Sequence, residues 1–156
     1  MGDKPQREGS VAGTAADCVE GKLEKRSEIS VVPSPQTLAQ VEDFLDEAMD
    51  DAGISMKIKC KLNIAIDEIM TNIVEYSTAT WAQAVWQVTE RAWQITFRDN
   101  GFAYDPLAKE DPDTTLSAQE RQIGGLGIFM VKELMDNVCY RYADGMNELT
   151  MEMFRQ

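Results

Sequence analysis

The sequence predicts an α+β fold, a two-layer α/β sandwich in which helices cover one face of a mainly antiparallel sheet. The prediction rests on capped amphipathic helices in the first half of the chain, alternating strand patterns in the second half, and tight-turn signals between neighbouring strands. At 156 residues the chain has the length of one domain with a substantial core. Residues 1–26 mix small and charged residues without a period, so we expect a disordered N-terminal arm ahead of a domain over residues 27–156.

The predicted domain begins with a strand and a helix. Residues 28–32 alternate and are rich in β-branched side chains, which is typical of a strand. Ser34 can cap a helix that has Pro35 at its first position, and Gly53 stands where a C-terminal cap belongs. The apolar stripe of this helix consists of Leu38, Val41, Phe44, Leu45 and Ala48.

A longer helix and a hairpin follow. Ser55 can cap a helix that runs to about Tyr76. Its apolar stripe consists of Ile58, Leu62, Ala65, Ile66, Ile69 and Ile73. Residues 84–89 and 93–97 alternate on either side of a turn at residues 90–91, which predicts two paired strands.

A polar stretch, a third helix and a second hairpin complete the predicted order. Residues 106–122 offer few core candidates, and a polar stretch between two glycine-marked loops is typical of a mobile lid. We expect a helix from Ile128 to about Asn137, because its apolar residues follow the 3.6-residue period. The dipeptide Asp144-Gly145 suits a tight turn between two strands within residues 138–155.

Composition excludes several classes of protein. The net charge of −12 and the lack of clustered Lys and Arg disfavour direct contact with nucleic acid. No apolar run approaches the roughly 18 residues of a membrane helix, and the N-terminus lacks the apolar stretch of a secretory signal, so we expect a cytoplasmic protein without membrane contact. The cysteines at positions 18, 60 and 139 are odd in number and widely spaced, which favours reduced thiols. The chain contains no histidine, so it holds no histidine general base and no phosphohistidine.

A polar pair on the second helix and two glycine-marked loops indicate a nucleotide site. Glu68 and Asn72 are four residues apart, so they lie one helical turn apart on one face. Residues 99–101, Asp-Asn-Gly, follow a strand, and residues 124–127, Gly-Gly-Leu-Gly, precede a helix. A carboxylate at a strand end can accept the amino group of a base, and glycines let the backbone approach phosphates. Each feature alone is common in turns or on solvated faces, but their joint occurrence favours ATP as the ligand.

These motifs, in this order, resemble those of the Bergerat-fold ATPases, the group that includes gyrase, MutL and the histidine kinases. The shared pattern is Glu68-x-x-x-Asn72, then Asp99-x-Gly101, then Gly125-x-Gly127, and it covers about residues 27–154. The longer motifs around these residues are similar to those of the stand-alone anti-sigma-factor serine/threonine kinases. These motifs are Asp67-Glu68-Ile69-Met70-Thr71-Asn72, Asp99-Asn100-Gly101-x-Ala103-Tyr104-Asp105-Pro106, Gly124-Gly125-Leu126-Gly127-Ile128 and Leu134-Met135-Asp136. The resemblance implies the Bergerat ATP-binding fold.

The resemblance also implies a role for each matching residue. Glu68 would be the general base, and Asn72 would help to hold Mg²⁺ against the phosphates. Asp99 would accept the adenine amino group, and Gly101 would let the backbone pass close to the base. Thr150, on the strand beside Asp99, would support adenine recognition. The residues facing the phosphates would be Arg121 in the lid and the loop Gly124, Gly125, Leu126 and Gly127.

By the same resemblance, the chain would be an ATP-dependent serine/threonine protein kinase that acts as an anti-sigma factor. Its substrate would be a STAS-domain anti-anti-sigma factor, its other partner a sigma factor, and we expect a homodimer. Two alternatives remain open. One is a protein-binding module gated by ATP or ADP without phosphoryl transfer. The other is the detached catalytic domain of a two-component kinase, which the lack of histidine disfavours.

Overall fold

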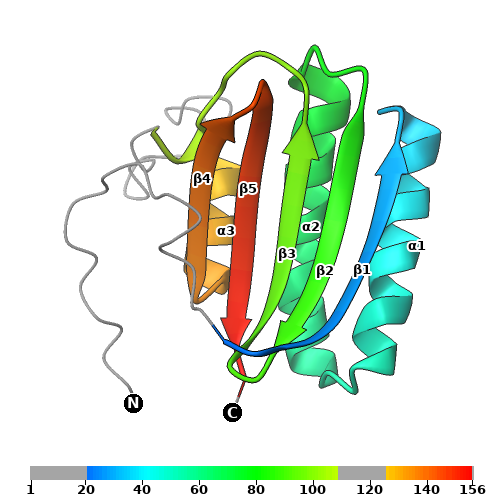
Figure 1. Ribbon diagram of the computed structural model, residues 1–156, viewed down its shortest axis with the longest axis vertical. Coiled ribbons are helices and arrows are strands. Elements are labelled where there is room, and N and C mark those ends of the chain that lie inside the picture. Colours follow the sequence, from blue (N-terminus) through cyan, green and yellow to red (C-terminus); the bar gives the residue numbers. More distant parts are fainter. Residues whose placement is uncertain (1–20, 109–125, 156) are drawn as a thin grey trace.

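The computed structural model describes residues 21–108 and 126–155. Its elements are β1 (Leu23–Val31), α1 (Pro35–Asp51), α2 (Met56–Tyr76), β2 (Ala82–Thr89), β3 (Ala92–Asp99), the short 3₁₀ helix η2 (Pro106–Ala108), α3 (Leu126–Leu134), β4 (Asn137–Ala143) and β5 (Met146–Phe154). The strands form one five-stranded antiparallel sheet in the order β1-β2-β3-β5-β4. Figure 1 shows α1, α2 and α3 on the same face of this sheet, so the predicted two-layer fold is confirmed. None of the described helices is long and apolar enough to cross a membrane.

Local capping signals set the bounds of the first two helices. The Ser34 hydroxyl accepts a hydrogen bond from the backbone N–H of Thr37 at 3.1 Å, and the Thr37 hydroxyl accepts one from the Ser34 N–H at 2.8 Å. This reciprocal pair satisfies two N–H groups that helix geometry leaves without partners. Beyond the end of α1, Gly53 has a φ of 68°, the left-handed conformation that suits glycine. Ser55 caps α2 by accepting from the N–H of Ile58 at 3.4 Å.

Two elements differ from their predicted bounds. β1 begins at Leu23, ahead of the expected domain start at residue 27, because it pairs with β2 as far as Thr89. Its first residues are exposed, so no apolar alternation marks them. α3 ends at Leu134 rather than near Asn137, where β4 begins. The residues proposed for a disordered arm include 1–20, which lie outside the described part of the chain.

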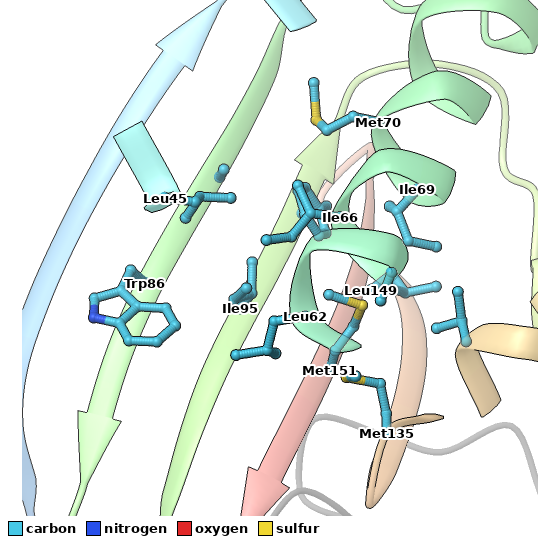
Figure 2. Close-up of a cluster of buried hydrophobic side chains, with 14 of the residues drawn as sticks. Leu45, Leu62, Ile66, Ile69, Met70, Trp86, Ile95, Met135, Leu149 and Met151 are labelled. Atoms are coloured by element: carbon cyan, nitrogen blue, oxygen red, sulfur yellow. The ribbon is translucent and has the colours of Figure 1, made fainter. Parts of the chain in front are cut away.

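One hydrophobic core joins the helices to the sheet. Figure 2 shows Leu45 of α1 and Leu62 and Ile66 of α2 among side chains from the central strands. The strands contribute Trp86, Ile95 and Met151, which are all fully buried, together with Leu149. α2 contacts both α1 and α3, so the helix that carries Glu68 and Asn72 is held on both sides.

The opposite face of the sheet is mostly polar. There Thr96 and Thr150 share a hydrogen bond of 2.9 Å between their hydroxyls, and Arg98 forms an ion pair with Glu148 at 2.8 Å. Cys139, opposite Thr150 in the strand register, is disulfide-bonded, which corrects the expectation that the cysteines are reduced. Cys60 on α2 is exposed and free.

Candidate nucleotide-binding site

A pocket of about 760 Å³ lies between α2, the loop after β3, and the start of α3. This volume is typical of sites for small molecules and cofactors. Its lining brings together four residues singled out in the sequence: Glu68, Asn72, Asp99 and Gly127. After the roles that the sequence predicts, we call Glu68, Asn72 and Gly127 the phosphate side, and we call Asp99, Gly101 and the neighbouring Asn147 the base side.

On the phosphate side, the carboxylate of Glu68 rests against the backbone of Gly127, in the first turn of α3. A Cβ added to Gly127 would lie 1.9 Å from the carboxyl carbon of Glu68 and 2.0 and 2.3 Å from its two oxygens. No residue other than glycine leaves room for this contact without a shift of Glu68. Burial, and then the negative charge of Asp67, raise the pKa of Glu68 above its usual value. A carboxylate with a raised pKa is a better proton acceptor.

Asn72 lies one turn further along α2, where its side chain lines the pocket. Among the described residues, none forms a hydrogen bond with its amide, so its oxygen is available to a ligand. An amide oxygen is a suitable ligand for Mg²⁺, which also takes phosphate oxygens and waters. Within residues 21–108 and 126–155, no cluster of three or more Asp, Glu, His or Cys could hold a metal ion. The amide oxygen of Asn72 could supply one ligand to a cation whose other ligands are phosphate oxygens and waters.

On the base side, Asp99 ends β3 and is only 8% exposed. Its Oδ1 accepts hydrogen bonds from the backbone N–H of Gly101 at 2.9 Å and from the amide of Asn147 at 3.1 Å. In the part of the chain that the structure describes, no group donates to Oδ2, so this oxygen can accept from a ligand. Gly101 is buried beside the carboxylate, and a Cβ there would lie 2.4 Å from the Ser77 hydroxyl. A side chain at this position would therefore require its neighbours to shift, and the role of Gly101 beside the base stays a prediction.

The structure does not bring Thr150 to the pocket. In the strand register Thr150 lies opposite Thr96, while Leu149 belongs to the helix-covered core. Successive strand residues point to opposite faces, so Thr150 lies on the face away from the pocket. This corrects the expectation that Thr150 supports adenine recognition. The polar residue of β5 that lines the pocket is instead Asn147, which pairs with Asp99 in the strand register.

The signal that could have identified Asn147 is the period of two along β5. Residues 147, 149, 151 and 153 share one face, and the apolar members of that set belong to the core. A polar residue in this series lies on the helix-covered side, near the end of the strand where the hairpin begins. The family resemblance directed attention to the hydroxyl of Thr150 instead.

Several predicted site residues lie in or beside the part of the chain that the structure does not describe. Arg121, Gly124 and Gly125 lie outside the described residues, as does most of the predicted lid over residues 106–122. Leu126 begins α3, but its side chain is not described. The roles suggested for these residues stay predictions.

The chain is similar to several known proteins. The family described as "Histidine kinase-like ATPase domain" matches residues 31–153. The chain is 30% identical over 101 residues to the "Serine/threonine-protein kinase BtrW" of Bordetella bronchiseptica, covering 62% of this chain and 71% of that protein. It is 28% identical over 104 residues to the "Serine-protein kinase RsbW" of Listeria monocytogenes, covering 62% of this chain and 66% of that protein.

A solved structure gives the same fold. The crystal structure of the RsbU and RsbW domains of a Mycobacterium tuberculosis protein matches with a TM-score of 0.59. The match covers 85% of this chain and 33% of that chain, at 15% identity. At this identity the similarity supports the fold and no more.

Proposed function

Because the chain belongs to the histidine kinase-like ATPase domain family, we propose that it is an ATP-dependent protein kinase that phosphorylates serine or threonine. The observation that carries this proposal is the composition of one pocket. It is lined by Glu68, a carboxylate whose pKa is raised, and by Asp99, an oriented carboxylate with one oxygen free of described partners. The similarity to two proteins named as serine kinases supports the same reading.

The base side would recognise adenine. The free Oδ2 of Asp99 would accept a hydrogen bond from the exocyclic amino group, and a charged acceptor makes such a bond about twice as strong as a neutral one. Gly101 would keep the nearby backbone within reach of the base, because it carries no side chain. Asp99→Asn is then expected to weaken ATP binding, and an unchanged affinity in calorimetry would remove this role from Asp99.

The phosphate side would carry out the transfer. Backbone N–H groups in the first turn of α3, around Gly127, would bind the phosphates of a nucleotide in this pocket, because a helix N-terminus stabilises anions. Asn72 would supply one ligand to Mg²⁺, which when bound neutralises phosphate charge. Glu68 would accept the proton of the incoming hydroxyl as its oxygen forms a bond to the γ-phosphorus. The bond from the γ-phosphorus to the β–γ bridging oxygen breaks, and ADP leaves.

The partners proposed here follow from the resemblance to anti-sigma-factor kinases. The phosphorylated protein would be a STAS-domain anti-anti-sigma factor, and the protein held inactive would be a sigma factor. We also propose a homodimer, with the cytoplasm as its location. The strongly acidic chain, with a net charge of −12, is compatible with basic surfaces on such partners.

The test is a transfer assay with the purified chain, γ-labelled ATP, Mg²⁺ and a STAS-domain protein. Glu68→Gln, which keeps the shape of the side chain, is expected to lower transfer by about 100-fold or more and to leave ATP binding nearly unchanged. Glu75→Gln is the matched control, because Glu75 is an exposed carboxylate of the same helix that does not line the pocket.

The outcomes separate the proposed kinase from its alternatives. Transfer by Glu68→Gln at the wild-type rate would show that another group is the base. ATP binding by the wild-type chain, without transfer to any of several STAS-domain proteins, would favour the nucleotide-gated binding module. Absence of ATP binding in calorimetry would contradict the proposed function itself.

A further inference from the structure

Asn147 is a buried residue of β5 that joins Asp99 to the loop beyond it. It is 8% exposed and lies directly opposite Asp99 in the β3–β5 register. Its amide nitrogen donates to Asp99 Oδ1 at 3.1 Å and contacts the carbonyl oxygens of Gly101 at 3.3 Å and Phe102 at 2.8 Å. One side chain therefore holds the carboxylate and the backbone that follows it.

The oxygen of the Asn147 amide also has two hydrogen-bond partners. It accepts hydrogen bonds from the backbone N–H of Tyr104 at 3.0 Å and from the hydroxyl of Tyr140 on β4. A backbone N–H can only donate and a carbonyl can only accept, so these contacts determine which end of the amide is oxygen. Burial raises the pKa of Tyr140, so its hydroxyl remains a donor at neutral pH.

This arrangement restricts the orientation of Asp99. Its Oδ1 receives two hydrogen bonds, one from the Gly101 N–H and one from Asn147, and rotation of the carboxylate would break both. The structure thereby leaves Oδ2 as the oxygen available to a ligand. Because an ionised carboxylate can only accept, it matches an amino group on a purine and opposes a carbonyl oxygen at the same place.

We propose that Asn147 is a positioning residue for base recognition, which orients the Asp99 carboxylate so that Oδ2 reads the 6-amino group of adenine. The proposal rests on the ATP binding proposed above and adds to it the residue that sets the preference for an amino group. Asn147 acts through Asp99, without itself contacting the base.

The test compares ATP with purine riboside triphosphate, which lacks the 6-amino group. In calorimetry the wild-type chain is expected to bind ATP about tenfold or more tightly than this analogue, the strength of a hydrogen bond to a charged group. Asn147→Leu keeps the approximate shape of the side chain, cannot donate to Asp99 and adds no charge beside its carboxylate. It is expected to bind both nucleotides with affinities within about twofold of each other, at an unchanged affinity for the analogue.

A second variant and a matched control guard against a loss of folding. Asn147→Ala removes the whole amide and should give the same loss of preference, measured on protein shown to be folded by thermal unfolding. Asn100→Ala is the control, because Asn100 holds the same loop through the N–H groups of Thr80 at 2.9 Å and Trp81 at 3.0 Å, without a contact to the carboxylate. It should preserve the wild-type preference for ATP.

Each result has a distinct meaning. An equal fall in affinity for both nucleotides in Asn147→Leu would show a purely structural role and overturn the inference, as would an unchanged preference. Equal wild-type affinities for ATP and the analogue would overturn the inference while leaving ATP binding intact. Absence of binding of either nucleotide to the wild-type chain would contradict the proposed function rather than the role of Asn147.

Discussion

A methyl group added at Gly127 would collide with the carboxylate of Glu68. The new Cβ would lie 1.9 Å from the carboxyl carbon, whereas non-bonded carbon atoms rest at about 3.5 Å or more. The carboxyl group would have to move by roughly 1.6 Å, the difference between these two distances. A misplacement of about 1 Å can cost about 100-fold in rate. We therefore expect Gly127→Ala to lower phosphoryl transfer about 100-fold.

The same substitution is expected to leave folding nearly intact. Gly127 is not among the described residues with a positive φ, so alanine can adopt its backbone conformation. The atoms that the methyl group would meet belong to the end of a flexible side chain rather than to backbone. Alanine in a helix is also favoured over glycine by about 1 kcal/mol. The free energy of unfolding should therefore change by no more than about 1 kcal/mol.

Two measurements test this reasoning. Single-turnover transfer from labelled ATP reports the displacement of Glu68, and thermal unfolding reports stability in the wild-type and Glu68→Ala backgrounds. Without the Glu68 carboxylate the collision is absent, so Gly127→Ala should be more stabilising there than in the wild-type background. A wild-type transfer rate in Gly127→Ala, or the same stability change in both backgrounds, would refute the contact as the cause.

Three further changes probe other parts of the structure. Asp67→Asn removes a negative charge that raises the pKa of Glu68. Since the base acts when deprotonated, the acid limb of the pH–rate profile should move to lower pH. An acid limb at the wild-type pH would contradict this coupling. Gly101→Ala places a Cβ 2.4 Å from the Ser77 hydroxyl and should lower the free energy of unfolding by about 1–3 kcal/mol in urea titration. A second change, Ser77→Ala, should restore part of the loss, and no restoration would argue against this contact. Leu45→Ala empties a fully buried core position and should lower the free energy of unfolding by about 2–5 kcal/mol in urea titration, whereas a loss below about 1 kcal/mol would be inconsistent with its burial.

Local signals in the sequence were sufficient for most of the fold. Ser34 and Ser55 cap the first two helices as predicted, because a capping bond joins residues only three positions apart. Asp144 and Gly145 have φ values of 56° and 75° and form the predicted turn, because this dipeptide accepts left-handed conformations.

The candidate site was predictable where it depends on one element or on backbone geometry. Glu68 and Asn72 both line the pocket because a spacing of four places them on one face of α2. Gly101 and Gly127 stand where no Cβ fits, which is why a glycine motif could indicate them. The roles of Arg121, Gly124 and Gly125 stay predictions, since they lie outside the described residues.

The sequence by itself determined the order of the elements, the ends of α1 and α2 and the residues of the glycine motifs, because these depend on contacts between near neighbours in the chain. Only the tertiary structure decided that Asn147 lies opposite Asp99 at the pocket, and that β1 extends back to Leu23. Both facts arise from pairing between distant strands. A shift of one residue in that pairing exchanges the two faces of a strand, and no local pattern in the sequence specifies the pairing partner of an exposed edge residue.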